Sequence, residues 1–183
     1  FIGRIIKEKG VATFIKSVKN IKENRKDINF SLVGPLDSGN PSYISEKTIR
    51  QWESENIIEW WGNVDDILEV YKQSSIIVLP SYREGLPKTL LEAGLTGRPV
   101  IASDVPGCRD VVVHGETGYL FPLNDSDTFS AYILNLIDDE KKMEKIGIAG
   151  REYIIKHFST DVIIPQLINE IENNINNRLF NNV

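Results

Sequence analysis

Short apolar runs alternate along this chain with longer segments in which apolar residues recur every three or four positions. Between residues 11 and 24, for example, Val11, Phe14, Ile15 and Val18 fall at helical spacing. Strand-like runs cover residues 1–5, 28–34, 57–61, 75–80, 99–103 and 119–121. Because strands that alternate with helices pair in parallel and need helices to cover them, the pattern predicts an α/β fold, with a parallel sheet and helices on both faces.

The remaining segments predict further helices and the turns between them. Helices are expected at 43–56, 64–73, 108–113, 126–138, 141–157 and 160–179, and turns at 35–42 and 114–118. No internal repeat or linker divides the 183 residues, so we expect one domain with a single core. Its last part, 160–183, is predicted to be a terminal helix with an Asn-rich tail that frays.

Composition narrows the class of function. Hydrophobic residues make up 41% and charged residues 26% of the chain, which is usual for a globular protein. A net charge of −5 argues against a nucleic-acid partner, because phosphate backbones bind basic surfaces. Cys108 is the single cysteine, which leaves no disulfide framework and fits a reducing compartment. His114 and His157 lack a paired ligand pattern, so no metal site is predicted.

The stretch from Arg83 to Gly94 is the most informative for chemistry. It follows a predicted strand, and Pro87 is expected at the first position of a helix. Glu84 therefore lies in a loop at a strand's carboxyl end, whereas Glu92 lies about one and a half turns into the helix. A half-buried carboxylate needs a partner. Ligand hydroxyls, at roughly 1.5–3 kcal/mol per charge-assisted hydrogen bond, would serve, and so would a backbone group or an Arg.

The residues after Glu84 predict an anion site. Open α/β sheets bind ligands at the carboxyl ends of strands, where helix amino termini present free N–H groups. The helix dipole contributes only about 0.3–2 kcal/mol, so cationic side chains should assist a diphosphate. Arg4 and Lys9, at the exit of the first predicted strand, are the candidates, although both would also suit a solvated surface. The expected anion-site residues are Gly85, Leu86, Pro87, Lys88 and Thr89.

Together these motifs resemble the Glu-x7-Glu signature of the retaining glycosyltransferases of family 4. The resemblance covers nearly the whole chain: Phe1-Ile2-Gly3-Arg4, Glu8-Lys9-Gly10, Leu32-Val33-Gly34, Trp61-Gly62-Asn63-Val64, Leu79-Pro80-Ser81, the block from Glu84 to Glu92, 99–104 and 114–120. It implies one Rossmann-like half of the two-domain GT-B architecture. Residues 1–183 would be the carboxy-terminal, nucleotide-sugar-binding domain, with the acceptor-binding amino-terminal domain absent from this chain.

The resemblance also implies a role for each candidate residue. Arg4 and Lys9 would hold the donor diphosphate, Glu84 would meet the transferred sugar and Glu92 the ribose hydroxyls. The departing phosphate would take the acceptor's proton, which retains the anomeric configuration; spacing leaves open whether Glu84 acts as a nucleophile. Strand-end positions that would face the nucleotide are Gly3, Gly34, Trp61 and Gly62, although a core position is the other interpretation of the tryptophan.

The expected reaction is transfer of a hexose or N-acetylhexosamine from a UDP-sugar to a glycan or polyprenyl-linked acceptor. Similar bacterial enzymes assemble capsule, lipopolysaccharide and lipid-linked oligosaccharides. The resemblance implies no metal or other cofactor, a cytoplasmic location, and contact with the inner face of the membrane only through the absent domain. The isolated chain would bind donor but would not transfer sugar.

Two other functions fit the same fold. An epimerase would turn over UDP-N-acetylglucosamine without an acceptor. A phosphorylase would need a Schiff-base lysine; Lys88 lies beside the expected phosphate site, but nothing else in the sequence supports that role, and a surface or phosphate-edge lysine is the favoured interpretation. A non-catalytic sugar-nucleotide-binding module would bind donor and transfer nothing.

Overall fold

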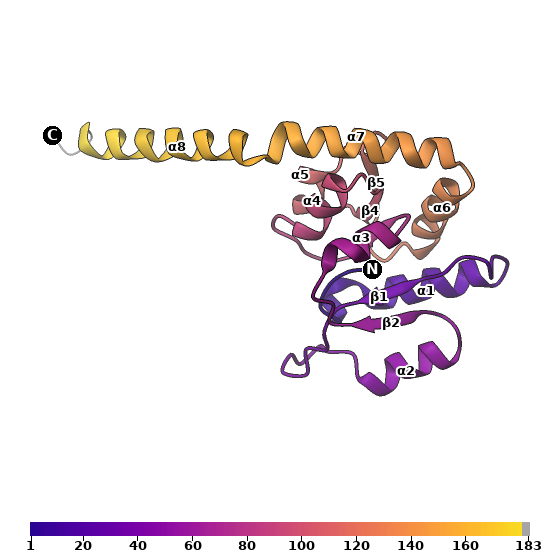
Figure 1. Cartoon of the computed structure of the whole chain (residues 1–183). Helices are drawn as coiled ribbons and strands as arrows, with labels where there is room; N and C mark the ends of the chain where they lie inside the picture. The colour runs from indigo at the N-terminus through magenta and orange to yellow at the C-terminus, as the bar shows by residue number, and fades with distance from the viewer. Residues whose placement is uncertain (181–183) are drawn as a thin grey trace.

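The alternation of strands and helices predicted from the sequence is confirmed in a computed structural model, which describes residues 1–180. Figure 1 shows the order of the elements along the chain. They are η1 (Lys7–Lys9), α1 (Val11–Lys22), β1 (Ser31–Val33), α2 (Glu46–Ser54), β2 (Glu59–Gly62), α3 (Ile67–Gln73), β3 (Ile77–Leu79), α4 (Lys88–Leu95), β4 (Val100–Ser103), α5 (Pro106–Val111), β5 (Gly118–Phe121), α6 (Ser126–Ile137), α7 (Glu140–Phe158) and α8 (Thr160–Phe180).

The strands form two parallel sheets where the sequence predicts one. β1 pairs with β2, and β3, β4 and β5 form a second sheet in that order. The strand predicted at 1–5 is wrong, since only Ile2 forms a bridge, with Val33. The backbone turns away after Gly3 because the amide of Ile6 donates to the Arg4 carbonyl at 3.0 Å. The next residue, Ile5, contacts the loop after β1 instead, where its amide donates to the Pro35 carbonyl at 3.3 Å.

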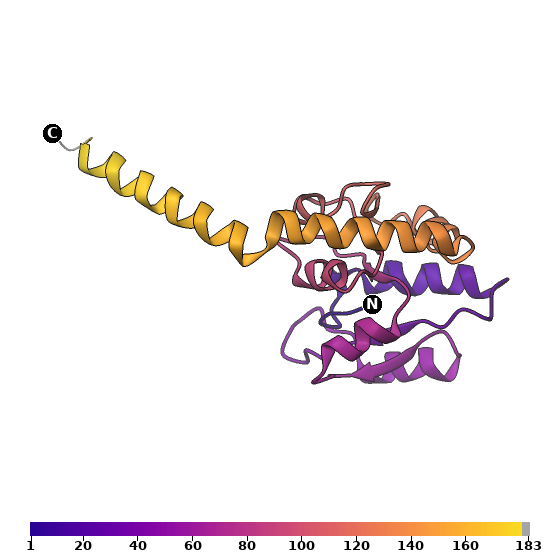
Figure 2. The ribbon, with the colours of Figure 1, turned by 45° about the horizontal axis from the view of Figure 1, so that its top comes forward.

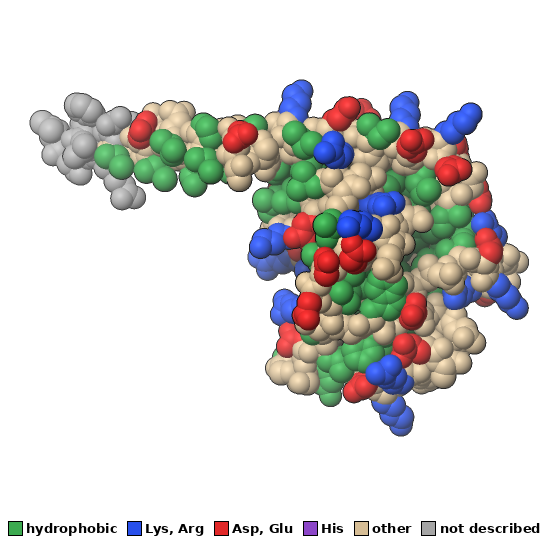
Figure 3. Space-filling view, in the orientation of Figure 1, with side chains coloured by type: hydrophobic (Ala, Val, Ile, Leu, Met, Phe, Trp, Pro, Cys, Tyr) green, Lys and Arg blue, Asp and Glu red, His purple; other side chains and the backbone are tan. Residues whose placement is uncertain are grey.

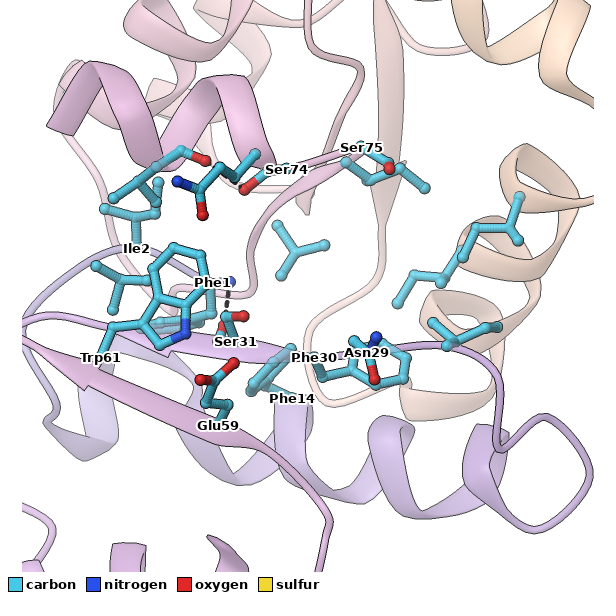
Figure 4. A pocket seen from close by; sticks show the side chains of 18 of the residues that line it. Phe1, Ile2, Phe14, Asn29, Phe30, Ser31, Glu59, Trp61, Ser74 and Ser75 are labelled. Carbon is cyan, nitrogen blue, oxygen red and sulfur yellow. Dashed lines mark hydrogen bonds between the residues drawn. The ribbon is translucent and has the colours of Figure 1, made fainter.

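A cavity of about 690 Å³ lies between the two sheets. Figure 4 shows Phe1, Ser31, Glu59 and Trp61 on one side of it and the segment with Ser74 and Ser75 on the other. The amino group of Phe1 donates to the Ser31 carbonyl at 2.9 Å, and burial lowers the pKa of that amino group to about 5. This cavity borders the amino ends of β1 and β3, away from the loops that follow those strands.

The three-stranded sheet is covered on both faces, as predicted. Alternate residues of β3 and β4 point into different cores: Val78 and Ile101 pack with α1 and α6, whereas Leu79 and Ala102 pack with α4 and α5. Burial on both faces explains why these strands are continuous apolar runs, without polar alternation. Figures 1 and 2 show α7 lying across the same side of the molecule as α4 and α5.

Helix boundaries differ from the predictions at α2, α3 and α5. α2 begins at Glu46, three residues later than expected. The Ser45 hydroxyl caps it there by accepting a hydrogen bond from the Thr48 amide at 3.2 Å. Asp66 likewise caps α3 at the Leu68 amide. α5 begins earlier than expected, at Pro106, since proline suits the first position of a helix.

α8 extends from the end of α7 away from the rest of the molecule (Figures 1 and 2). The predicted helices at 141–157 and 160–179 are confirmed within two residues, and the helix continues into part of the predicted Asn-rich tail. Asn181 and Asn182 lie outside the described residues. Figure 3 shows apolar side chains along α8. The exposed ones are Ile163, Ile164, Leu167, Ile168, Ile171 and Ile175.

Gly10 joins η1 to α1 where the backbone touches the end of β3. Its φ is +73°, and a Cβ there would lie 1.8 Å from the carbonyl oxygen of Pro80. Any side chain at this position would therefore force η1 away from the segment that follows β3.

We expect Gly10→Ala to lower the free energy of unfolding by about 3 kcal/mol or more, because a left-handed φ and a backbone clash add together. Gly115→Ala shares the positive φ but meets open space, and should cost about 1 kcal/mol. Gly39→Ala meets open space without that φ and should change stability by less than about 0.5 kcal/mol. Urea unfolding of the three variants checks this order; equal losses for Gly10 and Gly115 would refute the clash.

Candidate functional site

The loop between β3 and α4 is held against η1 by main-chain contacts. The amide of Tyr82 donates to the Glu8 carbonyl at 2.9 Å, beside the Gly10–Pro80 contact. These two contacts bring segments more than 70 residues apart in the sequence side by side, so that Lys9 faces Glu84. The convergence of these two residues was predicted from the sequence, and the geometry places them together.

Lys9 and Glu84 form a half-buried ion pair. The Lys9 Nζ donates to Glu84 Oε1 at 2.6 Å, and the two side chains are 22% and 10% exposed. A pair with so little solvent is screened less than an exposed one. Lys9 therefore neutralises the charge of Glu84 in the loop between β3 and α4. Two further N–H groups of its ammonium group remain for another acceptor.

The far side of the loop rests on α5. A Cβ at Gly107 would lie 2.0 Å from the Gly85 carbonyl oxygen and 2.6 Å from that of Glu84, so only glycine permits this approach. The neighbouring Cys108 is fully buried, and burial, with a smaller contribution from the Glu84 carboxylate, raises the pKa of its thiol to about 12. Sequence reasoning missed Gly107; its signal was a glycine directly after Pro106 at a helix start.

α4 presents its amino terminus beside the ion pair. Pro87 is the N-cap, with ψ of 106°, and not the first helical residue as predicted, because its extended backbone turns the carbonyl toward the amide of Leu90 at 3.0 Å. The helix therefore starts at Lys88, and its first two amides, those of Lys88 and Thr89, have no acceptor within the helix. Gly85 and Leu86 lie exposed in the loop just before it.

Glu92 receives a hydrogen bond from a tyrosine, a partner that sequence reasoning missed. The Tyr71 hydroxyl donates to Glu92 Oε2 at 2.8 Å, and its oxygen lies 3.4 Å from the Thr89 carbonyl. Tyr71 is 1% exposed, and burial together with the adjacent carboxylate raises the pKa of its phenol far above the usual value. The backbone or Arg expected as the alternative partner is replaced by a neutral donor.

Three of the predicted strand-end glycines lie in a row. The amide of Gly3 donates to the Val33 carbonyl at 2.9 Å, and the amide of Gly34 donates to the Gly62 carbonyl at 2.8 Å. A Cβ at Gly34 would lie 1.9 Å from the Gly3 carbonyl oxygen. The Trp60 indole N–H donates to the Gly34 carbonyl at 3.1 Å and fixes this row from the side of β2.

Two predicted site residues make contacts outside the Lys9–Glu84 pair. Arg4 is 57% exposed in its side chain, and its Nη1 donates to Asp37 Oδ2 at 3.0 Å in the loop after β1. Trp61 is half-buried and lines the cavity between the sheets (Figure 4). The ring of Trp60 packs on the core, with the Arg50 guanidinium 4.8 Å from its centre.

Within residues 1–180, no group of His, Cys, Asp and Glu side chains has the arrangement of a metal site. Among the same residues, no helix combines the length and apolar character that crossing a bilayer requires.

Comparison with known proteins decides the family. Residues 1–153 match the family model described as Glycosyl transferases group 1. The chain belongs to this family. It is 31% identical over 167 residues to the capsular polysaccharide biosynthesis glycosyltransferase CapM of Staphylococcus aureus, covering 91% of this chain and 43% of that protein. It is also 33% identical over 141 residues to the Escherichia coli UDP-Gal:alpha-D-GlcNAc-diphosphoundecaprenol alpha-1,3-galactosyltransferase, covering 76% of this chain and 36% of that one.

The structural neighbours of this group 1 glycosyltransferase domain are GT-B glycosyltransferase domains, which confirms the predicted fold class. One is the crystal structure of the C-terminal domain of a group 1 family protein, LpcC, from Francisella tularensis. It shares 25% identity with a TM-score of 0.73, covering 87% of this chain and 85% of that one. The chain spans less than half the length of the curated relatives it matches.

A double-mutant cycle with Lys9→Met and Glu84→Gln tests the half-buried ion pair. We expect a coupling free energy of about 1–3 kcal/mol from urea unfolding, because both side chains are largely shielded from water. The matched control is the exposed pair of Glu46 and Arg50, with side chains 56% and 57% exposed, which should couple by less than about 0.5 kcal/mol. Equal coupling in the two cycles would contradict the shielding.

Proposed function

We propose that this domain binds the donor of a retaining glycosyltransferase that moves a hexose or N-acetylhexosamine from a UDP-sugar to a glycan or lipid-linked acceptor. One observation carries the proposal: the free amides at the start of α4 open beside the Lys9–Glu84 pair, with Glu92 on the same helix. The names of two relatives support it, since one acts in capsular polysaccharide biosynthesis and the other uses UDP-Gal and a diphosphoundecaprenol acceptor.

The diphosphate would bind where main-chain amides and a cation meet. The amides of Lys88 and Thr89 would donate to phosphate oxygens, and Lys9 would bridge those oxygens and Glu84. An unpaired Glu84 would repel the phosphates, so its neutralisation by Lys9 is what allows an acid and an anion to share one site. Glu84 keeps Oε2 for the hydroxyls of the sugar.

Arg4 would join the site by exchanging partners. The ion pair of Arg4 with Asp37 is largely exposed, and such pairs contribute about 0–1 kcal/mol to stability. Breaking this pair to bind a diphosphate would therefore cost little free energy. The guanidinium would then stabilise the charge that grows on the phosphate as the bond to the sugar breaks. With two cations and two amides supplying this neutralisation, we propose that no metal ion is needed.

Retention would follow from reaction on one face of the sugar. The departing phosphate takes the acceptor's proton while the acceptor oxygen bonds to the anomeric carbon from the same side, with Glu84 positioning the sugar. The acceptor would be held by the remainder of a longer protein, since this chain matches less than half of its curated relatives. The domain alone would then bind donor without transferring sugar, and any membrane contact would belong to that remainder.

Calorimetric titration of the chain with UDP, ADP and GDP tests the proposed donor. We expect UDP to bind most tightly, and Arg4→Ala and Glu92→Ala each to weaken UDP about tenfold or more, since each removes charge-assisted hydrogen bonds. Arg25→Ala and Glu144→Ala are the matched controls; Arg25 pairs with Asp27, which precedes β1 and so lies at the opposite edge of the sheet.

Titrations repeated with EDTA should give the same UDP affinity as titrations with Mg²⁺. Absence of UDP binding by the parent chain, or equal affinity in all four variants, would overturn the proposal. A dependence of binding on Mg²⁺ would overturn its metal-independent part alone.

A further inference from the structure

The hydrogen bond between Tyr71 and Glu92 joins the proposed ribose site to a helix that supplies none of its predicted ligands. We propose that Tyr71 is a positioning residue, which holds the Glu92 carboxylate toward the 2′- and 3′-hydroxyls and thereby selects a ribonucleotide over a 2′-deoxynucleotide donor. This inference rests on the proposed function, in which Glu92 accepts hydrogen bonds from the ribose.

Tyr71 is fixed before any ligand arrives. It lies in the last turns of α3, it is 1% exposed, and it belongs to the same core cluster as Leu90 and Ala93 on α4. Burial restricts the ring, and its hydroxyl lies within hydrogen-bond distance of two acceptors. Glu92 Oε2 at 2.8 Å is nearer than the Thr89 carbonyl at 3.4 Å, and a carboxylate is also the stronger acceptor.

This contact leaves Glu92 both oriented and incompletely satisfied. A carboxylate offers about four acceptor positions, and the phenol occupies one of them on Oε2. Glu92 is only half-buried, so part of this residue stays open to solvent and to a ligand. Anchoring one oxygen restricts the rotation of a long side chain, and a preorganised acceptor binds its hydroxyls at a lower entropic cost.

Selectivity for ribose follows from the same geometry. A donor that lacks the 2′-hydroxyl leaves the anchored carboxylate with an acceptor position that nothing fills, and unfilled polar positions in a binding site discriminate strongly against the smaller ligand. Once the phenol is removed, the Glu92 carboxylate can turn to solvent, and loss of the 2′-hydroxyl from the ligand should then lower its affinity less.

The test compares UDP with 2′-deoxy-UDP by calorimetry on the 183-residue chain and on Tyr71→Phe. We expect the parent chain to prefer UDP about tenfold or more. In Tyr71→Phe, affinity for UDP should fall about three- to tenfold and affinity for 2′-deoxy-UDP less than twofold, so that the preference for UDP becomes smaller. In a Glu92→Ala background, Tyr71→Phe should change neither affinity.

Tyr132→Phe is the matched control, because Tyr132 stacks on Tyr119 and loses the same atom; it should leave the preference intact. Equal weakening of both ligands by Tyr71→Phe, or an unchanged preference, would overturn the inference while leaving the proposed function standing. A parent chain that binds UDP and 2′-deoxy-UDP equally would instead show that Glu92 does not meet the ribose, and would overturn that part of the proposed function. A melting curve for each variant separates these results from unfolding.

Discussion

The approach of Gly10 to the Pro80 carbonyl is the contact on which the site depends. A residue with a Cβ cannot occupy this position, and the Tyr82–Glu8 backbone hydrogen bond lies beside it. Together these two backbone contacts join the end of η1 to the loop after β3. This arrangement places Lys9, at the end of η1, and Glu84, in the loop after β3, within hydrogen-bond distance of one another.

The two signature acids are held in different ways, and the difference suits different tasks. Glu84 faces a cation, which lowers the net charge where phosphates would gather. Glu92 faces a neutral phenol, which orients the carboxylate but leaves its charge in place for hydroxyl donors. A charged partner at Glu92 would compete with ligand hydroxyls, whereas a neutral partner at Glu84 would leave an acid facing an anion. In both cases the partner comes from outside the segment that carries the acid.

The sequence predicts the parts of this structure that depend on local pattern. Apolar alternation placed most strands and helices, and the strand–loop–helix order around Glu84 placed the free amides of α4. The prediction at Pro87 was one position too early, because proline accepts both the extended and the helical backbone and only the Leu90 amide decides between them. The strand at 1–5 was wrong because a local turn at Arg4 outweighs an apolar pattern.

Apart from the convergence of Lys9 and Glu84, the partners of the site residues were not visible in the sequence. Tyr71 lies 21 residues before Glu92, and Gly107 follows Gly85 by 22, so no local spacing connects them. Arg4 pairs with Asp37 in a loop whose path is set by turns and not by periodicity. The cavity between the sheets also had no sequence signal, because its lining combines apolar and polar residues from strands, helices and loops that are far apart in the sequence (Figure 4).

The most direct measurement is a backbone-amide NMR titration of this chain with UDP. If the free amides of α4 receive the diphosphate beside the lysine–glutamate pair, the largest shifts will fall on residues 84–86, on Lys88 and Thr89 and on Lys9, with smaller ones at Gly34 and Gly62. Shifts confined to Ser31, Ser74 and Ser75, which line the cavity between the sheets, with none at Lys88 and Thr89, would place the nucleotide elsewhere and contradict the account.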